Sequence, residues 1–194
     1  MSQPTTNRSY SRQNKLGMAA MTTALITGIS GFVGSHLAER LLSATDWEIF
    51  GMMRWRSPLD NLELLIPFAN EGKRVHFLYA DLHDGISIRH AVMESKPDYV
   101  FHLAAQSFPK TSFTSPEDTI DTNMSGTLRL LDALKTHAPN AIIHVCSSSE
   151  VYGRVPKEFV PIDENCRFHP ASPYAISKIG ADLIAQHYAE AYGM

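Results

Sequence analysis

Two side chains near the end of the chain, Tyr174 and Lys178, have types and a spacing suited to acid–base chemistry. Residues four apart on a helix lie on one face, so the ammonium can stand close to the phenol. A nearby positive charge stabilises a phenolate relative to the phenol, which makes a tyrosine usable as a base. We therefore predict that Tyr174 is a general base and that Lys178 tunes it.

Ser148 is a candidate donor for the same reaction. It lies in residues 146–153, CSSSEVYG, which follow an apolar run typical of a buried strand. Residues at the carboxyl ends of strands in an α/β sheet face the ligand crevice, so the Ser148 hydroxyl can donate to a substrate oxygen beside Tyr174. Its two neighbours can have a purely structural role instead of a functional one. Ser149 can be an ordinary loop residue, and Glu150 can cap the loop that follows.

A glycine-rich turn near the start of the chain indicates a nucleotide site. Residues 27–34, TGISGFVG, link an apolar run to a helical pattern. Glycines let the backbone approach a pyrophosphate, and the N–H groups at a helix start favour the anion. The spacing is one residue wider than G-x-G-x-x-G, but the required strand–turn–helix context is present. We predict dinucleotide binding through Gly28, Ser30, Gly31, Phe32, Val33 and Gly34.

The residues after the second apolar run favour NADP over NAD. An acid about 20 residues beyond the turn holds the ribose 2′-hydroxyl of NAD, whereas an arginine accommodates the 2′-phosphate of NADP. Met53 stands where the acid is expected. Arg54, Arg56 and Ser57 follow, and each can bond to a phosphate. The alternative is that both arginines are solvated loop residues.

Side chains after the third and fourth apolar runs complete the predicted cofactor site. Asp81, with Leu82 beside it, is placed to accept a hydrogen bond from the adenine amino group. Ala104 and Ala105, which follow Leu103, are small enough for the backbone to pass close to the cofactor.

The elements that must position these residues alternate between strand and helix. Strands are expected over residues 24–27, 47–53, 75–80, 99–104 and 141–146. Four helices are expected: one that begins at residue 33, one that contains residues 88–93 and ends before Pro97, one over 116–137 and one over 172–192. Such alternation requires right-handed crossovers in a parallel sheet, so the fold class is a doubly wound α/β (Rossmann) domain. The connections over 54–72 and 153–171 are long, which indicates functional segments.

Composition narrows the class of protein. The 194 residues are 44% hydrophobic with a formal net charge of −3, which argues against a disordered chain and a nucleic-acid binder. No apolar run is long enough to cross a bilayer. Cys146 and Cys166 suit neither a disulfide scaffold nor a metal site, so no metal and a cytoplasmic location are expected. Residues 1–21 lack acidic side chains and read as a flexible extension, with a transit peptide as the alternative, before a domain over 22–194.

Taken together, these motifs resemble those of the extended short-chain dehydrogenase/reductase superfamily of nucleotide-sugar epimerases and dehydratases. Its marks are the glycine turn, a Ser or Thr after the fifth strand, and Tyr-x-x-x-Lys. Within it the chain is most similar to the GDP-mannose 4,6-dehydratases. The resemblance spans residues 24–192 and rests on ALITGISGFVG, the 54–57 stretch, AAQS at 104–107, SGTLRLLDA at 125–133, SSEVYG at 148–153 and SPYA at 172–175.

The resemblance implies a reaction. After Tyr174 and NADP oxidise sugar C4, the residue matching Glu150 removes the C5 proton, water leaves C6 and the hydride returns to C6. Ser148 would polarise the ketone, and Lys178, like Tyr174, would also contact the cofactor. Ser107, Ser149 and Glu150 are the implied contacts to the nucleotide-sugar substrate. A homodimer or homotetramer is implied as well, with no nucleic-acid or membrane partner.

The resemblance leaves alternatives open. Epimerases generally lack the carboxylate at Glu150, but reductases of GDP-4-keto-6-deoxy sugars can carry it. Ser148 stands where dehydratases generally have Thr, and Asn123 where the mannose dehydratases tend to have Asp; Ser149 replaces the acid of the dTDP-glucose enzymes. Relatives continue after the last helix with a substrate-binding portion that this chain lacks, so a cofactor-binding fragment without turnover is the further alternative.

Overall fold

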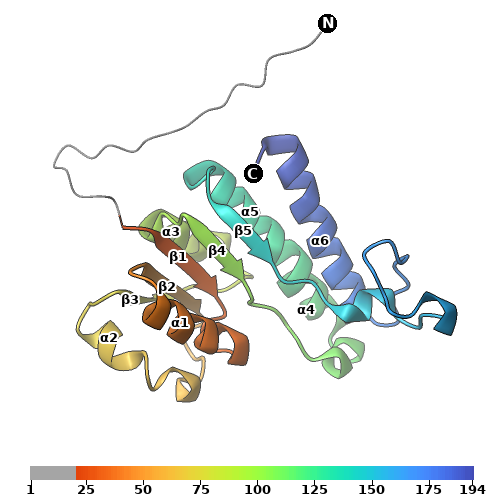
Figure 1. Cartoon of the computed structure of the whole chain (residues 1–194), viewed down its shortest axis with the longest axis horizontal. Coiled ribbons are helices and arrows are strands. Elements are labelled where there is room, and N and C mark those ends of the chain that lie inside the picture. The colour runs from red at the N-terminus through yellow and green to blue at the C-terminus, as the bar shows by residue number, and fades with distance from the viewer. Residues whose placement is uncertain (1–20) are drawn as a thin grey trace, which may run out of the picture.

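The computed structural model describes residues 21–194, and its centre is one parallel sheet (Figure 1). The expectation for residues 1–20 of the predicted extension lies outside the described residues. The sheet has the order β3-β2-β1-β4-β5. Its strands are β1 Thr23–Thr27, β2 Glu48–Met53, β3 Val75–Tyr79, β4 Tyr99–His102 and β5 Ile142–Val145.

Helices cover both faces of the sheet, which confirms the predicted doubly wound architecture (Figure 1). The α-helices are α1 Phe32–Ala44, α2 Ile66–Asn70, α3 Gly85–Ser95, α4 Pro116–Ile120, α5 Gly126–His137 and α6 Pro173–Tyr192. Short 3₁₀ turns are η1 Asp60–Leu62, η2 Pro109–Phe113, η4 Ser149–Tyr152 and η5 Lys157–Phe159. Described residues contain no helix long and apolar enough to span a membrane.

Each face of the sheet has its own core. Successive strand residues point to opposite faces, and Leu25 and Ile26 of β1 are both fully buried. Leu25 joins a cluster with Ile88 of α3 and Leu134 of α5, whereas Ile26 joins α1 and the residues around η1 and α2. Burial on both faces explains why the strands read as continuous apolar runs.

One predicted helix departs locally from α-helical geometry. The helix expected over 116–137 forms over that whole range, but its turn Asp121–Ser125 (η3), between α4 and α5, is π-helical. Its buried Asn123 is held by side-chain bonds to neighbouring segments, which no helical period encodes. The 54–72 connection, expected to be a functional segment, contains η1 and α2, and its Leu62 and Leu65 are fully buried in the core cluster that includes residues of α1.

Helix ends follow local chemistry. The Asp84 carboxylate caps α3 by accepting from the N–H groups of Ile86 and Ser87, and Lys96 ends that helix in a left-handed conformation before Pro97, as predicted. The Ser172 hydroxyl caps α6 by accepting from the Ala175 N–H at 3.1 Å. This cap fixes where the helix of Tyr174 and Lys178 begins.

Candidate active site

A cleft of about 420 Å³ opens at the carboxyl ends of β1, β2, β3 and β4. In this strand order β1 lies between β2 and β4. The order in which strands are added reverses between β1 and β4, and ligands of open α/β sheets bind at such a point. Most predicted cofactor residues line it: Gly28, Ser30, Gly31, Arg54, Ser57, Asp81, Leu82, Leu103, Ala104 and Ala105, together with the substrate candidate Ser107. The structure therefore brings four separate chain segments to one cleft.

The glycine turn fits closely against its neighbours. Gly28 has a φ of +74°, and a Cβ there would lie 2.9 Å from the Ala104 backbone. A Cβ on Gly34 would lie 2.3 Å from the Gly28 carbonyl oxygen. Helix α1 begins after Gly31 with no side-chain cap, so its first N–H groups are available to a ligand.

Three predicted turn residues do not line the cleft with their side chains. Phe32 and Val33 are 73% and 59% exposed, so only their backbone can serve the site, and Gly34 is buried beneath the turn. Sequence reasoning missed Asn61, whose amide donates to the Ser30 carbonyl at 2.9 Å and so supports the turn from η1.

The end of β2 presents one arginine of the predicted pair. Arg54 and Ser57 line the cleft, and the Ser57 N–H donates to the Arg54 carbonyl at 3.0 Å in a tight turn. Arg56 is exposed and does not line the cleft. Met53 is 3% exposed and lines the cleft where an acid would hold a ribose hydroxyl.

Asp81 lies at the end of β3 with one carboxylate oxygen engaged. Its Oδ1 accepts from the His83 N–H at 3.0 Å and contacts the His83 ring Nδ1 at 2.9 Å. Burial raises the pKa of Asp81, but these hydrogen bonds and the charge of Arg54 outweigh it, so this pKa lies below its ordinary value. The carboxylate is therefore ionised and can accept from a ligand.

Beneath the cleft, buried His102 links β1 to η3 and α5. The Thr127 hydroxyl donates to the Asn123 carbonyl at 2.6 Å, so it accepts from His102 Nε2 at 3.0 Å. Burial and the nearby Lys178 charge lower the pKa of His102 to about 3, so its Nδ1 accepts from the Thr27 hydroxyl at 2.8 Å. Thr27 Oγ1 in turn accepts from the N–H groups of Leu103 and Ala104. The chain of bonds fixes the Leu103–Ala104 backbone at the cleft floor.

The predicted catalytic residues come from two elements that pack together, η4 and α6. Tyr174 and Lys178 are 8% and 7% exposed on α6. Burial lowers the pKa of Lys178. The Ser148 side chain caps η4 by accepting from the Glu150 N–H at 3.2 Å. The Glu150 side chain is exposed, and its carboxylate accepts no hydrogen bond within residues 21–194, so the cap in this loop is Ser148 and not Glu150.

Asn123 connects the cofactor cleft to this helix. Its Oδ1 accepts from the Gln106 N–H at 2.7 Å, and its Nδ2 donates to the Gln106 carbonyl at 3.0 Å and to Ser177 Oγ at 2.9 Å. The Ser177 hydroxyl donates to the Tyr174 carbonyl at 2.7 Å. One amide thus holds the loop after β4 in register with the helix that carries Tyr174.

Several cleft residues were missed by sequence reasoning. Four of them, Asp118 and Thr122 of the 116–137 segment and Gln106 and Phe108 after β4, reach the cleft only through tertiary packing. A fifth, His83, stands two residues after Asp81, and this short spacing was a signal that could have been used. The remaining ones, Met52, Met53 and Ala80, are the strand ends themselves.

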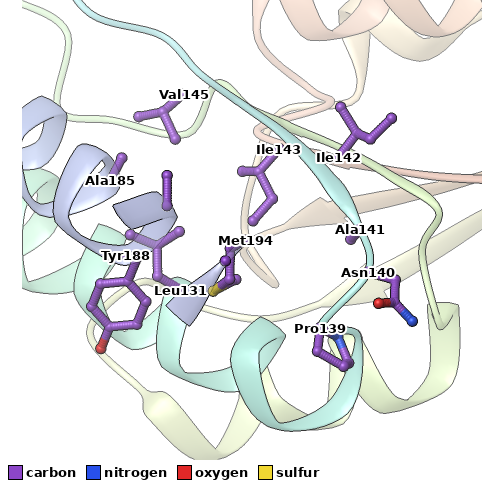
Figure 2. A pocket seen from close by; sticks show the side chains of 12 residues that line it. Leu131, Pro139, Asn140, Ala141, Ile142, Ile143, Val145, Ala185, Tyr188 and Met194 are labelled. Carbon is purple, nitrogen blue, oxygen red and sulfur yellow. The ribbon is translucent and has the colours of Figure 1, made fainter. Parts of the chain in front are cut away.

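A second cavity, of about 430 Å³, lies at the β5 edge of the sheet, between β5, α5 and the C-terminal part of α6. Figure 2 shows Leu131, Ile143 and Met194 pointing toward one another there. None of the predicted site residues lines it. Over residues 21–194, no group of three or more His, Cys, Asp or Glu is placed to hold a metal, and both cysteines are free.

Comparison with known families decides the relationship of the chain. A family model described as GDP-mannose 4,6 dehydratase matches residues 25–194. The chain belongs to this family. It is 39% identical over 177 residues to a GDP-mannose 4,6 dehydratase of Drosophila melanogaster and 40% identical over 179 residues to GDP-mannose 4,6 dehydratase 2 of Arabidopsis thaliana. These matches cover 88% of this chain but 44% and 47% of the relatives, so the chain spans about half the length of the curated relatives it matches.

Solved structures show the same fold relationship. A UDP-glucose 4-epimerase of Thermus thermophilus in complex with NAD superposes with a TM-score of 0.76 at 30% identity, covering 88% of this chain and 52% of that one. RMD from Pseudomonas aeruginosa, complexed with NADPH, gives a TM-score of 0.69 at 33% identity over 89% of this chain and 51% of that one. Both solved structures thus share the fold of this chain over nearly nine tenths of its length.

Proposed function

We propose that this chain is the cofactor-binding and catalytic part of an NADP-dependent nucleotide-sugar 4,6-dehydratase acting on GDP-mannose. The observation that carries the proposal is the packing of η4, with Ser148 and Glu150, against α6, with Tyr174 and Lys178, in a chain of this family. A donor, two bases and a cation are the groups that oxidation at C4 and elimination across C5–C6 require.

The residues that would hold NADP fit that group. The tight glycine turn and the uncapped start of α1 suit a pyrophosphate, and the ionised Asp81 suits an amino group of the base. Arg54 and Ser57, beside a Met in place of an acid, suit a 2′-phosphate. When bound, NADP would accept the hydride from C4 and return it to C6.

Each catalytic side chain then has one task. The buried Lys178 ammonium stabilises the phenolate form of Tyr174, and this phenolate removes the proton of the 4-hydroxyl and becomes a phenol. Ser148 donates to the C4 oxygen, which makes the C5 proton acidic. Glu150, whose carboxylate is exposed in η4, removes that proton and passes it to the C6 hydroxyl, which leaves as water.

Two alternatives share this scaffold, and isotope labelling separates them. GDP-mannose deuterated at sugar C4 is incubated with the whole enzyme and NADP, and the sugar is analysed by mass spectrometry. A dehydratase gives a product lighter by one water with deuterium at C6, whereas an epimerase returns deuterium to C4 and loses no water. A 4-keto-6-deoxy-sugar reductase leaves GDP-mannose unchanged and consumes NADPH with the keto sugar. Absence of water loss from GDP-mannose and from other nucleotide hexoses would contradict the dehydratase assignment.

A cofactor-binding fragment without turnover is the second candidate. The observation in its favour is that the chain covers less than half of its dehydratase relatives. Here binding of NADP without binding of GDP-mannose is the expected result, and turnover by the 194-residue chain would exclude it. For the whole enzyme we also propose a homo-oligomer, because Leu128, Ile176 and Leu183 expose apolar area on α5 and α6. We propose a cytoplasmic location as well, because Cys146 and Cys166 are both free.

A further inference from the structure

His83 contacts two opposite walls of the cleft. On one side its Nδ1 lies 2.9 Å from Asp81 Oδ1, in the turn that follows β3. On the other side its Nε2 lies 3.1 Å from the Thr122 hydroxyl and 3.4 Å from an Asp118 carboxylate oxygen, at α4 and η3. All four residues line the cleft. The imidazole therefore bridges two of the segments that line the cleft, and we call this set of bonds the cross-cleft contact.

The cross-cleft contact exists in both protonation states of the ring. A neutral imidazole with its proton on Nδ1 donates to Asp81 and accepts from the Thr122 hydroxyl. A protonated ring donates from Nδ1 to Asp81 and from Nε2 to Asp118, which is a pair of charge-assisted bonds. Asp121, whose carboxylate is 3.6 Å from Nε2, is bound by Arg129 at 2.9 Å and is therefore already paired.

The contact also orients the Asp81 carboxylate. Both the backbone N–H and the ring of His83 bond to the same oxygen, Oδ1. The other oxygen, Oδ2, receives no hydrogen bond within residues 21–194 and belongs to a side chain that lines the cleft. An ionised carboxylate oxygen can only accept, so it favours a base with an amino group over one with a carbonyl at the same place.

We propose that His83 is a positioning residue that aims Asp81 Oδ2 at the amino group of an adenine base and holds the α4–η3 wall at the distance this base needs. The proposal rests on the proposed cofactor function. It assigns to His83 a share of the selection of adenine nucleotides, which neither the glycine turn nor the arginine loop provides.

The test compares binding of NADP with that of its hypoxanthine analogue, in which a carbonyl replaces the adenine amino group. Isothermal titration calorimetry is run on the wild-type chain and on His83→Ala. We expect the wild type to prefer NADP by about tenfold, as one hydrogen bond to a charged group allows, and His83→Ala to bind NADP about three- to tenfold more weakly with a preference below about threefold. His90→Ala, an exposed histidine of α3 outside the cleft, is the matched control and should behave as the wild type.

Two further variants separate the halves of the contact. In His83→Asn the amide can replace Nδ1 and keep the Asp81 bond, so the preference for adenine should persist while affinity falls. In His83→Gln the amide can replace Nε2 and reach Thr122, so the preference should be lost. Hydrogen exchange of the free protein should show faster exchange over residues 118–122 in His83→Asn than in His83→Gln.

The outcomes distinguish this proposal from the one on which it rests. If the wild type binds NADP and His83→Ala retains both the affinity and the preference for adenine, the role of His83 is wrong and the cofactor function stands. If exchange over residues 118–122 is the same in all variants, the cross-cleft contact does not hold that wall. If the wild type binds no dinucleotide at all, the cofactor function itself is contradicted, and the proposal for His83 falls with it.

Discussion

At the scale of single residues, Glu150 is the side chain on which the dehydratase assignment turns. Glu150→Gln keeps the shape of the side chain and removes its basicity, so C4 oxidation should proceed while elimination stalls. In the whole enzyme we expect water loss from GDP-mannose to fall by at least about 100-fold, the usual contribution of a positioned base. Rapid quenching and mass spectrometry should detect the trapped 4-keto hexose.

The control for Glu150→Gln is Glu158→Gln, which removes an exposed carboxylate of η5 in the same connection between β5 and α6. It should dehydrate GDP-mannose at the wild-type rate. Near wild-type turnover of Glu150→Gln would remove Glu150 from the mechanism.

His102 makes stability depend on pH. Its pKa is about 3 in the folded state, against 6.5 ordinarily, because the ring is buried. The unfolded state thus binds more protons between these values, and the free energy of unfolding should decrease by up to about 1.4 kcal/mol per pH unit as the pH falls below 6.5. Urea unfolding between pH 4.5 and 7.5 measures this. His102→Gln, which can still donate to Thr127, should be less stable at pH 7 but show a flatter dependence; an unchanged slope would assign the effect to other groups.

At the scale of elements, the glycine turn joins β1 to α1 with no room to spare. In Gly34→Ala the new Cβ would meet the Gly28 carbonyl oxygen at 2.3 Å and the Ile29 Cα at 2.8 Å, so the turn must open. We expect a loss of about 2 kcal/mol or more in the free energy of unfolding, as for other overpacked sites, and loss of NADP binding. Gly85→Ala, at the first position of α3, is the control, because its nearest neighbour would be Arg129 Cδ at 4.0 Å. Equal stability and binding in the two variants would contradict the close fit of the turn.

The π-helical turn η3 depends on the amide of Asn123. Asn123→Asp would turn two donated bonds, to the Gln106 carbonyl and to Ser177 Oγ, into contacts between acceptors. The side chain is 2% exposed, so we expect a loss of about 1–3 kcal/mol in the free energy of unfolding, measured by urea denaturation. Asn140→Asp, on an exposed loop, should change it by less than about 0.5 kcal/mol. An equally small effect at both positions would mean that the loop after β4 is not held by Asn123.

How far the sequence predicts the structure differs between elements for physical reasons. Strands such as β1 are buried on both faces and flanked by helical patterns, so composition and period suffice to predict them. The helix over 116–137 is predictable from its period in the same way. The π-helical geometry of its turn 121–125 is not, because Asn123 bonds there to Gln106 and Ser177, which are distant in the sequence. The residues that line the cleft fall into two groups in the same way. Gly28 and Asp81 follow strands and could be predicted. Thr122 lines the cleft only because the tertiary fold places η3 beside it.

At the scale of the whole molecule, the described residues enclose the cofactor cleft more fully than they enclose the candidate substrate contacts. All residues that line the cleft fall between Gly28 and Thr122, and they come from four adjacent strand ends and from α4 and η3. Of the substrate candidates, Ser107 lines the cleft, whereas Ser149 and Glu150 are exposed outside it. A sugar bound at Ser149 and Glu150 would therefore lie on an open surface of the described residues.

The 194-residue chain should therefore bind NADP without binding GDP-mannose tightly. A dinucleotide gains its affinity from a concave site that surrounds it, whereas a ligand on an open surface buries too little area to offset its lost freedom. Calorimetric titration with each ligand alone checks this, and Gly34→Ala, which should abolish the NADP signal, shows that the signal comes from the cleft. GDP-mannose binding as strong as that of NADP would mean that the described residues already form a closed substrate site. In that case the fragment alternative is excluded, and the exposed carboxylate of Glu150 must become covered when the sugar binds.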